Sequence, residues 1–155
     1  MARVSAAKAE NRLSGKPLAL GRLERHLGYF VRRLQLWIFQ DFIKTLAPMK
    51  VRPAQYSVLL LVEANPGRSQ SALGQALGIE RARLARMLHE LERRNWIARH
   101  ANGGDARAHS LYLTADGKLA LTRIKRLADR HEAHLLKRLG ADHHTRLLRR
   151  LREFG

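Results

Sequence analysis

The residues of this sequence best suited to chemistry are basic side chains that share one helical face near the middle of the chain. Between Glu80 and Asn95, apolar residues recur as a single helix stripe: Leu84, Met87, Leu88 and Leu91. A rotation of about 100° per residue puts another set opposite Leu84: Ala82, Arg86, His89 and Arg93, with Arg83 on one flank. Such a face can bind a polyanion, or it can be a solvated helix surface that binds nothing.

Two of these arginines have the chemistry to read a DNA base. A guanidinium can donate two hydrogen bonds to the edge of guanine, so Arg83 and Arg86 are the predicted base readers. The small Ala82 permits close approach or contact with a thymine methyl group, and His89 lies on the same face. Arg81 is better placed to contact a phosphate.

A second candidate site follows the turn residues Asn102-Gly103-Gly104-Asp105. Asp105 and Arg107 are two residues apart, so on an extended strand their side chains project to the same side. The carboxylate can then hold the guanidinium outward, toward a partner. The alternative is an ordinary surface ion pair, worth less than about 1 kcal/mol.

Length and charge agree with a nucleic-acid partner. The 155 residues are close to the size of one domain, and 45% are hydrophobic, enough for a buried core. Lys and Arg number 30 against 13 Asp and Glu, which gives a net charge of +17. Nucleic acid is the commonest reason for such an excess, although basic tails and anionic membrane surfaces produce similar totals.

Several other classes of protein are disfavoured. The absence of cysteine excludes disulfides, thiolate nucleophiles and cysteine metal sites. The longest apolar run, residues 58–62, is far below the roughly 20 residues of a membrane span, and no apolar segment of a secretion signal follows Arg3 and Lys8. We therefore expect a cytoplasmic protein with no membrane partner.

The elements that must position the basic face begin with a helix. Residues 1–19 have no periodicity and are predicted to form a flexible basic arm. From Leu20, apolar residues recur at intervals of three and four, which predicts one long amphipathic helix ending near Ala47-Pro48. A second helix is predicted to open at Pro53 and to stop at Asn65-Pro66-Gly67.

The next segments predict a helix-turn-helix followed by a wing. Ser69 can cap a short helix, Gly78 supplies the turn after it, and the basic helix follows. After Trp96 the pattern alternates, which predicts two short strands around the Gly-Gly turn. Thr114 can cap a further helix, and a final helix follows Gly140. The fold class is thus mainly α with a small β wing.

These segments together resemble the MarR family of bacterial transcriptional regulators over roughly residues 20 to 154. The resemblance is carried by three stretches in order: residues 73–79 (LGQALGI), residues 88–97 (LHELERRNWI), and residues 105–107 (DAR) followed by 111–117 (LYLTADG). The sequence departs from the family pattern at Glu80, where Ser is frequent, and at Asn95, where Gly is usual.

The resemblance implies an obligate homodimer in which the first helix and the two C-terminal helices interlock. It divides the chain into the arm (1–19), a dimerisation helix (20–50), a winged helix-turn-helix DNA-binding domain (51–116) and C-terminal dimerisation helices (117–155). The aromatic-rich stripe from Leu20 to Phe42 exceeds what one small core needs, which agrees with a covered interface. The alternative is that these stripes complete the core of a monomer.

The family's mode of action implies a repressor of a pseudo-palindromic double-stranded operator. The residue matching Arg107 enters the minor groove in this family, and the one matching Asp105 braces it. Two-fold symmetry puts the half-sites about 10 bp apart. The competing prediction from the same charge is a sequence-tolerant architectural DNA-binding protein. RNA binding is disfavoured, because the aromatic sheet platform it uses is missing.

Family members commonly release DNA when a small aromatic molecule binds between the dimer helices and the winged helix. Five residues supply rings and one cation near that crevice: Tyr29, Phe30, Arg33, Trp37 and Tyr56. Each could instead be a core residue. Residues 27–33 (LGYFVRR) also resemble regulators of hydroxycinnamate catabolism that respond to aromatic acyl-CoA thioesters, so the predicted effector is an aromatic acid or its CoA thioester.

Enzymatic and metal functions find little support. Phosphate-binding Gly loops, nucleophile elbows and paired carboxylates in a plausible cleft are missing, so we expect no enzyme and no cofactor. Five residues near the C-terminus could suggest a metal site: His131, His134, Asp142, His143 and His144. Without cysteines or a zinc-protease motif, they are predicted to be polar surface or dimer-interface residues, with no metal.

Overall fold

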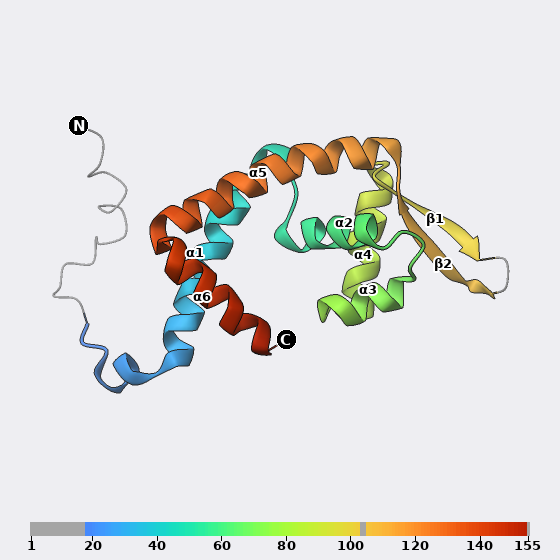
Figure 1. Cartoon of the computed structure of the whole chain (residues 1–155). Coiled ribbons are helices and arrows are strands. Elements are labelled where there is room, and N and C mark those ends of the chain that lie inside the picture. Colours follow the sequence, from blue (N-terminus) through green and yellow to red (C-terminus); the bar gives the residue numbers. More distant parts are fainter. Residues whose placement is uncertain (1–17, 103–104, 155) are drawn as a thin grey trace. The chain divides into compact units, whose positions relative to one another are not determined.

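The computed structural model describes residues 18–102 and 105–154, with the side chains of 101, 102 and 105–109 outside that description (Figure 1). The predicted N-terminal arm and the Gly-Gly turn therefore fall almost entirely outside the described residues. The chain divides into two units, residues 1–35 and 36–155, which we describe separately.

The first unit contains a short 3-10 helix η1 (Gly21–Arg25) and the beginning of helix α1 (Leu27–Leu46). The prediction of one continuous helix from Leu20 is wrong here. Gly21 has a left-handed φ of 55°, and His26 is extended with ψ of 108°, so α1 begins only at Leu27. Apolar residues at intervals of three and four are compatible with either a 3-10 helix or an α-helix, so this spacing does not reveal the break.

The second unit begins within α1, whose end at Leu46 agrees with the prediction. A 3-10 turn η2 (Ala47–Met49) follows, and Lys50, with φ of 50°, turns the chain into helix α2 (Pro53–Ala64). Pro53 occupies the first helical position, where its missing N–H costs nothing. The side chain of Gln55 accepts a hydrogen bond of 3.0 Å from the Arg52 backbone N–H and so closes this helix start.

The predicted helix-turn-helix is present as α3 (Gln70–Leu77) and α4 (Arg81–Arg93). The Ser69 hydroxyl accepts a hydrogen bond of 3.3 Å from the Ala72 N–H, which confirms the predicted cap. Gly78 has φ of 60° and ends α3 in the left-handed conformation. After α4, Asn95 has φ of 55°, a conformation that Asn tolerates better than most residues.

The wing is an antiparallel pair of strands, β1 (Ile97–Asn102) and β2 (Asp105–Leu113), that extends away from α3 and α4 in Figure 1. Ile97 pairs with Leu113, and the register is interrupted between Ala101 and Asn102. The chain before α3 also joins this sheet, because Gly67 N–H donates to the Leu111 carbonyl at 2.8 Å and Leu111 N–H donates to the Arg68 carbonyl at 3.1 Å.

Two C-terminal helices complete the unit, α5 (Ala115–Leu139) and α6 (Ala141–Leu151), followed by the 3-10 turn η3 (Arg152–Phe154). The Thr114 hydroxyl accepts from the Gly117 N–H at 2.9 Å, which confirms the second predicted cap. Gly117 packs directly on the Trp96 backbone, so a Cβ at this position would overlap with that backbone. Gly140, with φ of 82°, separates α5 from α6.

The core of the second unit lies where α2, α4, the wing and α5 meet. All four members of the predicted α4 stripe are buried in it. Partners come from the neighbouring elements: Val58, Leu59 and Val62 of α2, Ile97 and Leu111 of the wing, and Leu121 and Ile124 of α5. The fold class is confirmed as mainly helical with a small β wing in a winged helix arrangement.

A buried polar pair joins α1 to α5. His131 is only 2% exposed, and its Nδ1 lies 2.7 Å from Asp41 Oδ2, which is also 3.3 Å from His134 Nδ1. Phe42 stacks on the His131 ring at 4.7 Å. The expectation of a surface or interface residue is wrong for His131, because nothing in the local sequence reveals a partner 90 positions away.

The pKa of Asp41 lies below its ordinary value. Burial alone would raise this pKa, but the hydrogen bonds from His131 and His134 and the charge of these two residues outweigh burial. A carboxylate with a lowered pKa in the folded state stabilises the fold above its unfolded pKa, near 4, and this stabilisation is lost as the pH falls through the folded pKa.

We predict that Asp41→Ala lowers the free energy of unfolding at pH 7 by about 2 kcal/mol, because buried His131 loses its acceptor. Urea unfolding followed by circular dichroism measures the change. The difference in the free energy of unfolding between Asp41→Ala and wild type should persist down to about pH 5 and shrink below pH 4. The exposed carboxylate of Glu153 provides a control, since Glu153→Ala should change stability by less than about 0.5 kcal/mol. Equal stability of Asp41→Ala and wild type at pH 7 would contradict the assignment.

Candidate nucleic-acid interface

The exposed face of α4 carries all the side chains that the helical spacing placed there. Because the opposite stripe is buried, these residues are held in solvent: Arg81, Ala82, Arg83, Arg86, His89 and Arg93. The predicted division of this helix into a buried and an exposed face is therefore confirmed.

The carboxylates on and beside α4 are engaged by groups other than these arginines. Glu90 accepts a hydrogen bond of 2.7 Å from Gln55 of α2, and Glu92 pairs with Arg99 of β1 at 2.8 Å. Within the part of the chain that the structure describes, no ion pair involves Arg81, Arg83 or Arg86. Their charges are thus available to a polyanionic partner.

The third carboxylate, Glu80, forms the N-cap of α4. Its Oε1 accepts from the Ala82 N–H at 2.9 Å and its Oε2 from the Arg83 N–H at 3.2 Å. These backbone hydrogen bonds lower the pKa of Glu80, although the side chain is exposed, and Arg86 contributes in the same direction. The start of the basic helix therefore carries a fixed negative charge.

Two arginines that the sequence reasoning did not single out hold α4 against its neighbours. Arg94 donates to the Met49 carbonyl at 2.7 Å and to the Lys50 carbonyl at 3.0 Å, and its guanidinium stacks 3.5 Å from the Trp96 ring centre. Arg99 links the wing to α4 through Glu92. These long-range contacts have no local sequence signal, because the partners are other elements.

The predicted wing residues Asp105 and Arg107 lie on β2, where Asp105 pairs with Asn102 of β1. Their side chains are outside the described part of the chain, so their predicted ion pair stays a prediction. The anchoring of β1 to α4 through Arg99 nevertheless ties the base of this wing to the basic helix.

The structure distributes the predicted ligand-binding residues over separate groups. In the first unit, Arg33 donates to the Tyr29 hydroxyl at 3.1 Å, and the Tyr29 and Phe30 rings meet edge to face at 5.2 Å. In the second unit, Trp37 contacts the Arg138 guanidinium at 4.5 Å. Tyr56 meets Phe42 edge to face at 5.7 Å, and burial raises the pKa of its hydroxyl.

A pocket of about 540 Å³ lies between α1, α2 and α4 of the second unit. Its apolar lining comes from five residues: Phe39, Ile43, Pro53, Ala54 and Met87. Its polar lining comes from Arg52, Arg83, Arg86 and Glu90. None of the five predicted ligand residues lines this pocket. The sequence signal for it is that Phe39 and Ile43 lie off the main apolar stripe of their helix.

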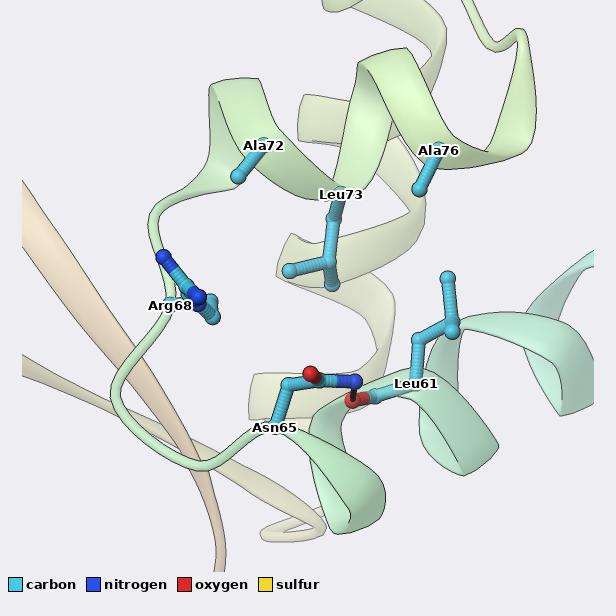
Figure 2. Close-up of a pocket in the computed structure, with 6 residues that line it drawn as sticks. All are labelled: Leu61, Asn65, Arg68, Ala72, Leu73 and Ala76. Carbon is cyan, nitrogen blue, oxygen red and sulfur yellow. Dashed lines mark hydrogen bonds between the residues drawn. The ribbon is translucent and has the colours of Figure 1, made fainter.

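A smaller pocket of about 160 Å³ lies between α2 and α3 (Figure 2). Leu61, Leu73, Ala72 and Ala76 give it apolar walls, and the Asn65 amide donates to the Leu61 carbonyl at 3.1 Å. Ligand sites usually occupy about 300 to 1,000 Å³, so the pocket that contains Arg83 and Arg86 is the better candidate for an organic ligand.

The residues that the structure describes contain no group of three or more His, Asp or Glu side chains arranged to hold a metal ion. No helix among them combines the length and the apolar composition that crossing a membrane requires.

Comparison with known proteins identifies solved structures and a curated protein that this chain resembles. The transcriptional repressor CouR bound to a 23-mer DNA duplex is 43% identical, with 90% of this chain and 99% of that chain covered and a TM-score of 0.86. CouR bound to p-coumaroyl-CoA is 42% identical, with 89% and 97% covered and a TM-score of 0.80. The protein named as the transcriptional regulatory protein for the hcr operon of Thauera aromatica is 32% identical over 79% of this chain and 74% of its own length.

Residues 50–108, which contain the helix-turn-helix and part of the wing, match the sequence profile of the MarR family. This match and the near-complete coverage of CouR agree with the exposed basic helix and the adjoining wing. The chain therefore belongs to the MarR family of winged helix transcriptional regulators.

Proposed function

We propose that this regulator is a sequence-specific repressor that a small aromatic ligand releases from double-stranded DNA, and that the ligand is an aromatic acyl-CoA thioester. The observation that carries the proposal is the face of α4, where Arg81, Arg83 and Arg86 are exposed and in no ion pair with a described residue. Such groups can neutralise phosphates and read bases.

The DNA contacts divide into phosphate and base contacts. Arg83 and Arg86 read guanine edges in the major groove, Ala82 and His89 lie close to the same groove, and Arg81 contacts a phosphate. Arg107 of the wing enters the minor groove, and Asp105 braces it there. The likeness to CouR, whose structure holds a DNA duplex, supports this arrangement.

We further propose a homodimer, which would cover apolar surface left exposed in one chain. In the second unit the exposed large apolar side chains are Leu36, Phe39 and Ile43 of α1, Tyr112 of the wing, Leu119 and Leu136 of α5, Leu148 and Leu151 of α6, and Phe154. Phe154 is 87% exposed, and a contiguous apolar patch formed by such side chains marks an interaction surface. Residues 20–50 and 117–155 would then dimerise, residues 51–116 would bind a pseudo-palindromic operator, and the site of action would be the cytoplasm.

The pocket beside α4 suits an aromatic acyl-CoA. Phe39, Ile43 and Met87 offer an apolar surface to a ring, whereas Arg52, Arg83 and Arg86 offer donors to phosphates. Arg83 and Arg86 belong to both the pocket and the proposed DNA face, so bound ligand and DNA would compete for the same guanidinium groups. The ring residues Tyr29, Phe30, Arg33, Trp37 and Tyr56 stay part of the proposal as further ligand contacts.

The first prediction concerns the wing. Arg107→Ala should weaken binding to the operator by about 1 to 3 kcal/mol, because the minor-groove contact is lost, while the dimer stays intact. Fluorescence anisotropy with a duplex selected from a random library measures the affinity, and sedimentation measures the assembly. Lys137→Ala removes the same charge from an exposed position on α5 and should leave the affinity for the operator close to that of wild type. An operator affinity of Arg107→Ala equal to wild type would refute the wing assignment.

The second prediction concerns the effector. Isothermal titration calorimetry with p-coumaroyl-CoA should give heat of binding, and the thioester should displace DNA. The free acid should give less heat, because it lacks the phosphates that Arg52, Arg83 and Arg86 bind. Ala54→Phe fills the pocket and should abolish this heat. Ala76→Phe adds the same volume in the smaller pocket of Figure 2 and should not. No heat with the thioester would remove the proposed effector class.

A further inference from the structure

Glu80 lies at the N-terminal end of α4. In a recognition helix, this is the end that enters the major groove. The N-terminal residues of such helices contact base edges, so this carboxylate would lie next to DNA. Its side chain is exposed, and its two hydrogen bonds to the Ala82 and Arg83 N–H groups fix it in place. This carboxylate is one of the 13 Asp and Glu residues of a chain with a net charge of +17.

The charge of Glu80 works against unspecific DNA binding. An uncapped helix N-terminus attracts phosphate through its free N–H groups and its dipole. In this chain the carboxylate occupies the N–H groups of Ala82 and Arg83, and it repels a phosphate that approaches the same end. Without a compensating donor from the DNA, Glu80 would weaken binding to every sequence.

Glu80 still has acceptor capacity that DNA can use. Each carboxylate oxygen accepts one backbone hydrogen bond, and each can accept a second one. The donors in the major groove are the exocyclic amino groups of cytosine and adenine. The backbone bonds keep the pKa of Glu80 low, so at neutral pH the group is an acceptor only and disfavours the acceptor atoms O6 of guanine and O4 of thymine.

We propose that Glu80 is a specificity-determining residue whose carboxylate accepts a hydrogen bond from the exocyclic amino group of a cytosine or adenine in the major groove, and which penalises base pairs that place an acceptor there. This inference rests on the proposed DNA-binding function of α4. Glu80 lowers the affinity for unselected DNA and creates a strong preference for one base pair in each half-site.

The test compares wild type with Glu80→Ser, because Ser keeps an N-cap and removes the charge. Duplexes are selected from a random library with each protein, and anisotropy then measures the affinity for every single base-pair change in both half-sites. For wild type, replacing the amino-bearing base at one position near the start of α4 should cost about ten-fold in affinity. Whether that base is cytosine or adenine identifies the donor.

For Glu80→Ser the preference at that one position should fall below about two-fold, while preferences read by the arginines persist, and affinity for unselected duplex should rise. Glu63→Ser makes the same change in net charge at an exposed carboxylate of α2, which pairs with Lys125, and should keep the wild-type preference. Circular dichroism verifies folding, and Glu80→Thr is the second capping variant. If wild type has no sequence preference, the proposed function itself fails. If wild type is selective and both variants keep every preference, the inference about Glu80 alone is overturned.

Discussion

The burial of one stripe of α4 is the constraint on which the rest of the structure depends. Leu84, Leu88 and Leu91 have no exposed surface, and each fully buried side chain of this kind stabilises the fold by about 1.5 to 3 kcal/mol. With this stripe fixed in the core, the rotation of the helix about its own axis is fixed too. The arginines on the opposite face must then point into solvent.

The polar contacts around α4 refine this arrangement. Glu90 and Glu92 bind Gln55 and Arg99 of neighbouring elements, so these carboxylates position the helix and do not neutralise its arginines. Arg94, which donates to the carbonyls of Met49 and Lys50, ties the end of α4 to the turn that precedes α2. Glu90 also lines the pocket beside this face, and there it shares a wall with Arg83 and Arg86.

This shared wall offers a simple route from ligand to DNA release. A ligand changes DNA affinity only if it binds the free and the DNA-bound protein differently. Competition for Arg83 and Arg86 meets that condition without any change in the backbone, because the same guanidinium groups cannot serve a phosphate of the ligand and the DNA together. The proposal therefore needs no hinge or rearranged helix.

Features with a local cause could be predicted from the sequence, whereas features that depend on distant partners could not. Ser69, Gly78 and Thr114 act on their own helix ends, and the spacing of Leu84 and its neighbours sets the faces of α4. The break at His26, the burial of His131 against Asp41, and the roles of Arg94 and Arg99 depend on backbone geometry or on contacts across the fold. The pocket between α1, α2 and α4 could not be predicted for the same reason, since its lining comes from three helices.

The proposed function requires two copies of α4 to read one symmetric DNA site. Hydroxyl-radical footprinting on a duplex selected by the purified protein shows whether they do. We expect protection confined to one pseudo-palindrome, with two half-sites about 10 bp apart. Uniform protection along the whole duplex, as a sequence-tolerant binder would give, would contradict this arrangement. Protection of a single half-site would contradict it too.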